Sequence, residues 1–192
     1  MSFHRIATLA LSVSLVGSFA AAGSLTGSVG GGRGSAVVYV NSIAGKTFDP
    51  PAKHVTMDQK NLKFQPHVVV VLVGTTVDFL NGDKVQHNIF WPSINGNKKM
   101  SHNMGTWPTG EIRSFKFAQT GVVPLLCNVH PEMSGYIIVT PTPYFAEADE
   151  SGNYKIDNLP DGQYTVSAWK EGKKVVSKPV TVSGNAKLDF SF

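Results

Sequence analysis

Residues 121–139 read Gly-Val-Val-Pro-Leu-Leu-Cys-Asn-Val-His-Pro-Glu-Met-Ser-Gly-Tyr-Ile-Ile-Val, two apolar runs joined by a short polar stretch. The stretch holds the only cysteine of the chain, Cys127, followed at short spacing by His130 and Met133. A thiolate, an imidazole and a thioether form a soft ligand set, which favours copper over hard cations. Because a tight loop between two strands can fold three side chains around one ion, the stretch predicts a copper-binding loop.

A fourth ligand must come from another part of the chain. A mononuclear copper site for electron transfer takes two histidines, one cysteine and a weak axial methionine. The best candidate for the other histidine is His87, which begins a short apolar run in Gly-Asp-Lys-Val-Gln-His-Asn-Ile-Phe. We therefore expect one Cu(I)/Cu(II) ion to be bound by His87, Cys127, His130 and Met133.

The segment Cys127–Met133, together with the pair His87-Asn88, resembles the cupredoxins, the blue copper proteins that include plastocyanin, azurin and amicyanin. The resemblance covers residues 55–140, and the Cys-x-x-His-x-x-Met spacing is most similar to that of amicyanin. It implies a Greek-key β-sandwich with a type 1 copper site. It also implies a one-electron carrier, with a redox protein such as a c-type cytochrome or an oxidoreductase as donor or acceptor.

The same resemblance implies roles for residues around the metal. Asn88 would lie behind the metal ligands and tie the two ligand loops together by hydrogen bonds. Pro131, and less firmly Trp91, would border an apolar patch through which electrons pass. His102 and Met104 could form a weak second copper site.

Each candidate ligand taken singly is more often structural. A lone cysteine after Leu125 and Leu126 is usually an inert core thiol, and a lone methionine usually packs in the core. Their joint occurrence at ligand spacing favours copper. Other metal groups fit less well, because c-type haem needs a second cysteine and structural zinc usually takes closed Cys and His sets without a thioether.

Two other functions stay open at this point. The chain could bind copper and deliver it without carrying electrons, or it could be a docking protein in which copper is structural. We do not expect an enzyme, because the sequence suggests no open coordination position, second metal or nucleophile–base pair. A net charge of +4 is too mild for a nucleic-acid binder.

The N-terminus predicts export. Residues 1–22 have His4 and Arg5, an apolar run from Ile6 to Phe19, and a small-residue site at Ala20–Ala22, the pattern of a signal peptide. The run is broken by serines and falls short of the about 20 apolar residues that span a membrane. We expect a periplasmic or secreted protein with no membrane span after cleavage.

The composition, with 19 Gly and 11 Pro, predicts an all-β chain rich in turns. Strands are expected at 36–40, 68–73, 76–80 and 112–118, and a long polar loop at 91–109.

Residues 141–192 resemble the carboxypeptidase regulatory-like, transthyretin-like β-sandwich, through turns such as Leu159-Pro160-Asp161-Gly162. The cupredoxin domain would then occupy residues 23–140. Residues 23–47 could instead complete the C-terminal sandwich, with the cupredoxin inserted between the two ends of the chain.

Overall fold

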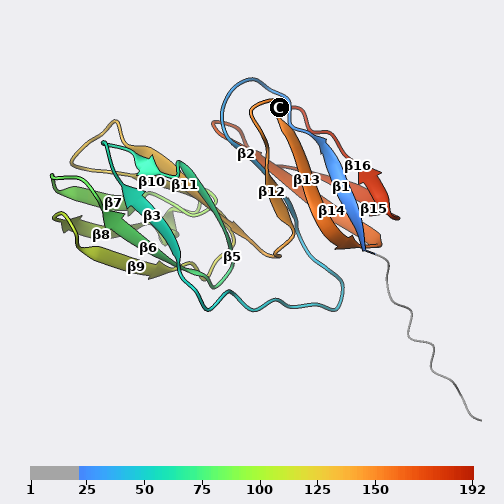
Figure 1. Cartoon of the computed structure of the whole chain (residues 1–192), viewed down its shortest axis with the longest axis horizontal. Coiled ribbons are helices and arrows are strands. Elements are labelled where there is room, and N and C mark those ends of the chain that lie inside the picture. The colour runs from blue at the N-terminus through green and yellow to red at the C-terminus, as the bar shows by residue number, and fades with distance from the viewer. Residues whose placement is uncertain (1–21) are drawn as a thin grey trace, which may run out of the picture.

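The computed structural model describes residues 22–192, which form two β-sandwiches side by side (Figure 1). Apart from Ala22, the predicted signal peptide lies outside the described residues. The elements are β1 (Ala22–Ser28), β2 (Ala36–Val40), β3 (Val55–Gln59), β4 (Phe64–Gln65), β5 (Val68–Leu72), β6 (Thr76–Asn81), β7 (His87–Trp91), the 3₁₀ helix η1 (Lys98–Met100), β8 (His102–Trp107), β9 (Ile112–Lys116), β10 (Gly121–Leu126), β11 (Ser134–Thr140), β12 (Phe145–Glu147), β13 (Asn153–Pro160), β14 (Gly162–Lys170), β15 (Val176–Val182) and β16 (Asn185–Lys187). No helix in this part of the chain is long and apolar enough to span a membrane.

Strands β3 to β11 form what we call the central sandwich. Its two sheets have the strand orders β5-β11-β10-β7-β8 and β4-β3-β6-β9. Apolar side chains from both sheets meet in one buried cluster that includes Phe79, Trp91 and Trp107. The expected strands at 68–73 and 76–80 appear as β5 and β6, because β-branched runs fit a buried pleated sheet. The prediction of an all-β chain built from two β-sandwiches is confirmed.

The prediction of a loop at residues 91–109 is wrong for residues 102–107. Residues 102–107 form β8, which pairs antiparallel with β7 at the edge of the sheet. This strand lacks an apolar alternation, since only Trp107 of its six residues is buried. Pairing with β7, rather than its own pattern, makes the segment extended.

The two ends of the chain together form the outer sandwich. Its sheets have the orders β13-β1-β16 and β12-β2-β14-β15, so β1 and β2 pair only with C-terminal strands. A separate buried cluster, with Leu25 and Val166 among its members, lies between these sheets. The pairing therefore disagrees with placing residues 23–40 in the cupredoxin domain, and it agrees with an inserted central sandwich. The C-terminal strands need β1 and β2 to complete both of their sheets.

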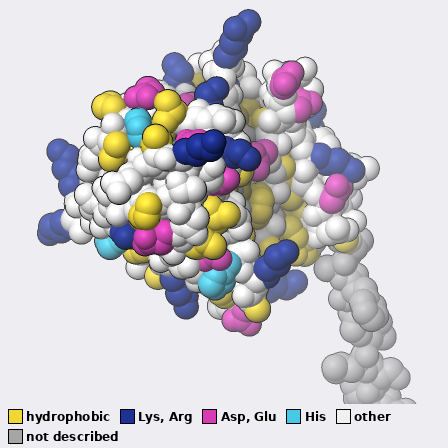
Figure 2. Space-filling model, turned by 60° about the vertical axis from the view of Figure 1, so that its left-hand side comes forward, with side chains coloured by type: hydrophobic (Ala, Val, Ile, Leu, Met, Phe, Trp, Pro, Cys, Tyr) yellow, Lys and Arg dark blue, Asp and Glu magenta, His cyan; other side chains and the backbone are white. Residues whose placement is uncertain are grey.

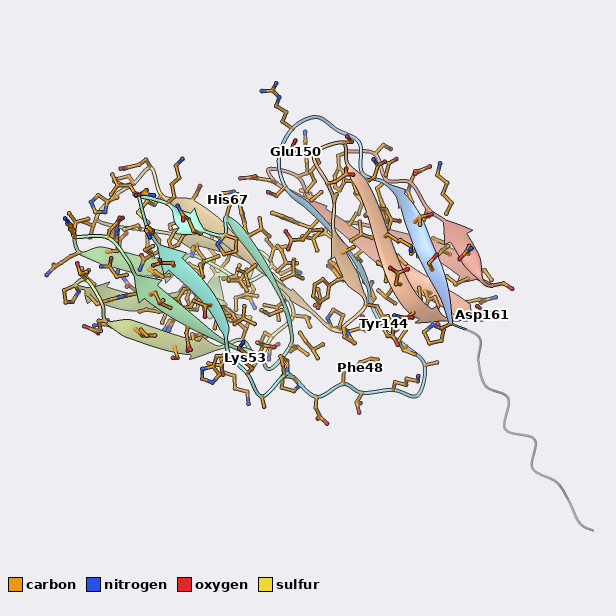
Figure 3. The ribbon with its side chains drawn as sticks, viewed as in Figure 1. Phe48, Lys53, His67, Tyr144, Glu150 and Asp161 are labelled. Atoms are coloured by element: carbon orange, nitrogen blue, oxygen red, sulfur yellow. The ribbon has the colours of Figure 1, made fainter. Side chains whose placement is uncertain are left out.

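The two sandwiches are packed against each other. Trp169 and Val37 of the outer sandwich share a buried cluster with Val68 and Ile138 of the central one. The rings of Trp169 and Tyr136 lie 4.9 Å apart, centroid to centroid. His67 Nε2 lies 2.9 Å from Glu171 Oε1 beside this cluster, and Figure 3 shows His67 on the side that faces the outer sandwich. The outer face of the β5–β11 pair is thus covered by the second sandwich.

The chain crosses twice between the sandwiches, and both crossings are anchored. In the second crossing, the hydroxyl of Thr142 donates to the carbonyl oxygen of Val40 at 2.7 Å. In the first, Phe48 lies edge-on to Tyr144, with a centroid distance of 6.0 Å (Figure 3). These contacts hold the ends of the inserted unit next to each other.

Candidate metal centre

Three predicted ligands meet at one end of the central sandwich. His87 is the first residue of β7, Cys127 directly follows β10, and His130 lies in the turn between β10 and β11. One donor atom from each side chain lies within 4.8 Å of the other two. His87 and Cys127 are buried, while His130 is partly exposed. The structure therefore brings together a thiol and two imidazoles from two separate stretches of sequence.

The orientation of the rings fits a metal ion. The Nδ1 atoms of His87 and His130 lie 3.0 Å apart and so face a common point. Two imidazole nitrogens and a cysteine sulfur that converge in this way are the donor set of a blue copper site. Met133 is buried in the same core cluster as Cys127, and its amide donates to the carbonyl of His130 at 3.0 Å. Its role as axial ligand remains a prediction.

Asn88 connects the two ligand stretches. Its backbone N–H donates to Cys127 Sγ at 3.4 Å, and its side-chain oxygen accepts from the amide of Asn128 at 3.3 Å. Its side-chain NH₂ donates to Asn103 Oδ1 of β8 at 2.8 Å. The backbone N–H helps to orient the Cys127 sulfur, and the side-chain bonds hold the two ligand stretches in register. These contacts are the kind that the resemblance implies for Asn88.

Asp83 is a residue of the site that the sequence reasoning missed. Its carboxylate lies 2.9 Å from His87 Nε2, on the side of the ring away from His130. The same carboxylate accepts from the backbone amides of Asn61 at 2.7 Å and Leu62 at 2.9 Å. A carboxylate on the distal nitrogen of a metal-binding histidine fixes the tautomer and the ring orientation. The turn after β3 thus anchors the carboxylate that orients His87.

The pKa of Asp83 reflects these contacts. Burial is the largest single influence and acts to raise the pKa of this carboxyl, but hydrogen bonds from the Leu62 amide, His87 and the Asn61 amide together outweigh it. The net effect holds the pKa of Asp83 below its usual value, so the group is a carboxylate at neutral pH. The sequence signal for this role is an Asp four residues before the histidine, in a stretch, Asn81-Gly82-Asp83, that is also typical of an ordinary turn.

We expect Asp83→Asn to weaken copper binding about 10- to 100-fold, because an amide holds the His87 ring less firmly than a carboxylate. A competition titration of the folded protein with a copper chelator of known affinity measures this change. Asp157→Asn is the matched control, since Asp157 is an exposed carboxylate of the outer sandwich that pairs only with Lys155. Equal copper affinities in wild type and Asp83→Asn would contradict the role of Asp83.

Of the two residues expected to border the electron-transfer patch, Trp91 lies elsewhere and Pro131 does not. Trp91 is only 1% exposed, and its indole N–H donates to the carbonyl of Met100 at 3.1 Å. It therefore cannot border a solvent-facing patch, because it points into the core between the sheets. Pro131 is exposed next to His130 and so remains a candidate for that patch.

The pair His102 and Met104 gains no support as a second copper site. The ring of His102 lies against Trp91 at 5.0 Å and Phe115 at 4.9 Å between centroids. Met104 is partly buried and packs against the central core. In residues 22–192 the one cluster of potential His, Cys and carboxylate ligands is that of His87, Cys127 and His130.

Comparison with protein families agrees with this geometry. Residues 51–140 match the family described as copper binding proteins, plastocyanin/azurin family. Residues 118–189 match polysaccharide lyase family 4, domain II, which overlaps the first match. The transthyretin-like resemblance of the C-terminal part therefore remains a prediction. The family match and the donor set make copper the metal of this site.

Several solved structures are similar to part of the chain. An oxidised proline-to-alanine mutant of amicyanin is 22% identical, with a TM-score of 0.42 over 45% of this chain and 81% of that one. A purple cupredoxin from Nitrosopumilus maritimus is 26% identical, with a TM-score of 0.40 over 45% of this chain and 99% of that one. A copper-containing nitrite reductase from Thermus scotoductus is 25% identical, with a TM-score of 0.43 over 54% of this chain and 25% of that one. No curated protein matches the chain.

Proposed function

Because residues 51–140 carry a copper-binding cupredoxin domain, we propose that the protein is an exported one-electron carrier between redox proteins. The observation that carries this proposal is the convergence of Cys127, His87 and His130 at one end of a rigid sandwich. Bound copper would supply a reversible change between Cu(I) and Cu(II). Export rests on the signal-like sequence of residues 1–22.

The central sandwich supports fast electron exchange because it limits the movement of the copper ligands. Cu(I) and Cu(II) prefer different geometries, so a site that moves little between the two states keeps the reorganisation energy small. His87 is held by Asp83 on one side, and Cys127 is held by the amide of Asn88. Both ligands are fixed by groups from β7 and its preceding turn, which leaves the donor set little freedom to rearrange.

The path for electrons runs through His130, the exposed member of the donor set. His87 is fully buried, whereas His130 is partly exposed in a turn that also carries Val129, which is 45% exposed. Val85, also 45% exposed, precedes His87 in the neighbouring turn. Figure 2 brings the central sandwich forward and shows hydrophobic side chains and histidines scattered over its surface. An apolar rim allows close approach of a partner without desolvating charges.

The partner that this end fits is a redox protein with an acidic surface around its cofactor. Lys60, Lys63 and Lys84 are exposed in the two turns that Asp83 joins. Positive side chains around an apolar centre steer the approach of a negatively charged surface.

The test measures electron exchange in the copper-loaded protein. We expect a reversible one-electron wave in voltammetry and rapid oxidation by a c-type cytochrome with an acidic face. Val129→Glu should lower the second-order rate constant about tenfold, because a carboxylate beside His130 repels the partner. Its reduction wave should stay reversible. Ile112→Glu, at a position 56% exposed on β9, is the control with the same added charge.

Two outcomes would favour the other functions. Release of Cu(I) to an acceptor protein, without a reversible wave, would indicate copper delivery. A protein that neither exchanges electrons nor releases copper would indicate a docking unit with structural copper.

A further inference from the structure

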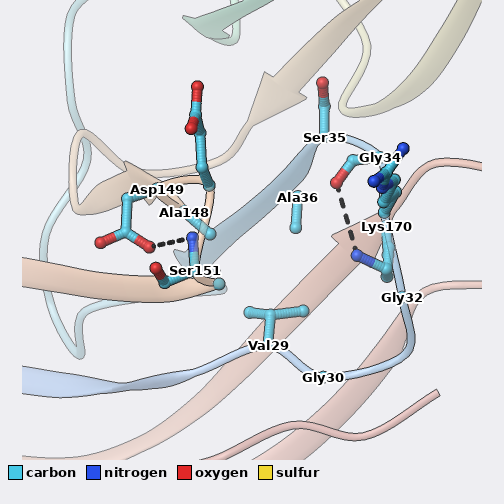
Figure 4. Close-up of a pocket in the computed structure, with 13 residues that line it drawn as sticks. Val29, Gly30, Gly32, Gly34, Ser35, Ala36, Ala148, Asp149, Ser151 and Lys170 are labelled. Carbon is cyan, nitrogen blue, oxygen red and sulfur yellow. Dashed lines mark hydrogen bonds between the residues drawn. The ribbon is translucent and has the colours of Figure 1, made fainter.

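A second site lies in the outer sandwich, away from the copper ligands. Residues 29, 30 and 32–35 of the loop after β1 and residues 148–152 of the turn between β12 and β13 border a cavity of about 710 Å³ (Figure 4). Lys170, the last residue of β14, completes its wall. None of the groups that we place at the metal lines this cavity.

The loop that forms one wall offers unused hydrogen-bond donors. Gly31, Gly32 and Gly34 have φ values of +102°, +90° and +111°, which L side chains rarely adopt. At Gly32 an added Cβ would meet nothing within 4 Å, so the backbone conformation rather than crowding requires the glycine. The amides of residues 31–34 donate to no backbone oxygen of residues 22–192. Free amides in a turn of this kind can accept an anion.

Lys170 is a buried cation with too few partners. The residue is only 3% exposed, and its ammonium makes one hydrogen bond, 3.4 Å long, to the carbonyl oxygen of Gly34. An ammonium has three donors, and in the described part of the chain no carboxylate lies within ion-pair distance of this one. A buried charge is costly unless it is paired. A ligand with negative charge would supply the missing partner.

The acidic residues of the opposite wall do not fill this role. The carboxylate of Asp149 accepts from the backbone amides of Ser151 at 2.9 Å and Asn153 at 2.8 Å, so it closes its own turn. Glu150 is exposed and forms no ion pair among the described residues. Arg33, which is also exposed, adds a second cation to the glycine-rich wall. Among the lining residues the charges thus separate into a basic wall and an acidic turn. Glu171, whose Oε2 lies 3.6 Å from the Cβ position of Gly34, pairs with His67.

We propose that this cavity binds the oxyanion of a small ligand, a carboxylate or a phosphate group, between Lys170 and the glycine-rich loop. The ammonium of Lys170 pairs with the anion, the free amides of residues 32–34 donate to its oxygens, and Arg33 closes the open side. Such charge-assisted hydrogen bonds are about twice as strong as neutral ones. The glycine-rich segment before β2 is then a binding loop, where its sequence alone suggests a flexible linker.

The test compares anions in the copper-loaded protein at constant ionic strength. We expect inorganic phosphate or acetate, but not chloride, to raise the unfolding temperature in a saturable way; the more effective of the two identifies the ligand group. Lys170→Met should weaken this binding about tenfold or more, because it removes the charged partner. Lys155→Met, an exposed lysine of β13, is the matched control and should bind as wild type does. The visible copper spectrum should not change when the anion is added.

Three results would overturn the proposal. The first is an unfolding temperature that rises as much with chloride as with phosphate or acetate. The second is unchanged anion binding in Lys170→Met. The third is a visible copper spectrum that changes when the anion is added. If Lys170→Met does not fold, the anion affinity of Arg33→Ala tests the proposal instead, because the exposed Arg33 side chain can be removed without loss of the fold. Anion affinity equal to wild type in Arg33→Ala would then contradict the site.

Discussion

Replacing Cys127 with serine is expected to abolish the intense visible absorption of the copper-loaded protein. In the wild type, the sulfur of Cys127 lies with two imidazole nitrogens in one set of donor atoms. A thiolate bound to Cu(II) gives a strong charge-transfer band, whereas a serine hydroxyl is a hard ligand and stays protonated. The variant should therefore be colourless or faintly coloured when Cu(II) is added to the chain without residues 1–22. The visible spectrum of equal protein concentrations measures the effect.

The control for this substitution is a second potential ligand outside the site. His102 packs against the rings of Trp91 and Phe115 and is not one of the three converging donors, so His102→Gln should keep the band at full intensity. A band that survives in Cys127→Ser, or that is missing in the wild type, would remove the basis for a blue copper site. The delivery or docking function would then be the better explanation of the fold.

The second large effect is expected at the contact between the sandwiches. Trp169→Ala should lower the free energy of unfolding by about 3–5 kcal/mol, the usual cost of removing a buried tryptophan. Trp169 is 2% exposed and shares its cluster with Val37, Val68 and Ile138. Because these neighbours belong to both sandwiches, the cavity would weaken each unit and their mutual packing.

Denaturant unfolding, followed by circular dichroism and by the copper absorption, measures this change. We expect the two signals to coincide in the wild type and to separate in Trp169→Ala, since the shared cluster couples the units. Ile112→Ala is the control, because a side chain that is 56% exposed should contribute within about 0.5 kcal/mol. A decrease in the free energy of unfolding of less than about 1 kcal/mol in Trp169→Ala would show that the sandwiches are stable independently.

Much of the fold could be predicted from local patterns. The β-branched run at residues 68–73 and the alternation at 76–80 correspond to β5 and β6. The prediction failed at β8, whose residues His102–Trp107 carry no alternation and are extended because β7 pairs with them. A local pattern cannot reveal a strand whose stability comes from a partner elsewhere in the chain.

In the candidate site, too, the local features could be predicted from the sequence and those that depend on distant segments could not. The residue types and spacing of Cys127, His130 and Met133 were enough to predict a copper loop, because the donor chemistry is local to seven residues. Burial is not local, which is why Trp91 was placed at the surface although the core between the two sheets encloses it. The carboxylate of Asp83 could not be assigned either, since its role depends on amides of the turn after β3.

The sequence by itself determined the metal chemistry of this protein and its all-β character. Both depend on residue identity and short spacing, which a chain carries before it folds. Only the tertiary structure decided that residues 22–40 pair with the C-terminal strands and that Lys170 is enclosed. The physical reason is that strand pairing and burial are relations between distant segments, and each segment alone is compatible with several partners.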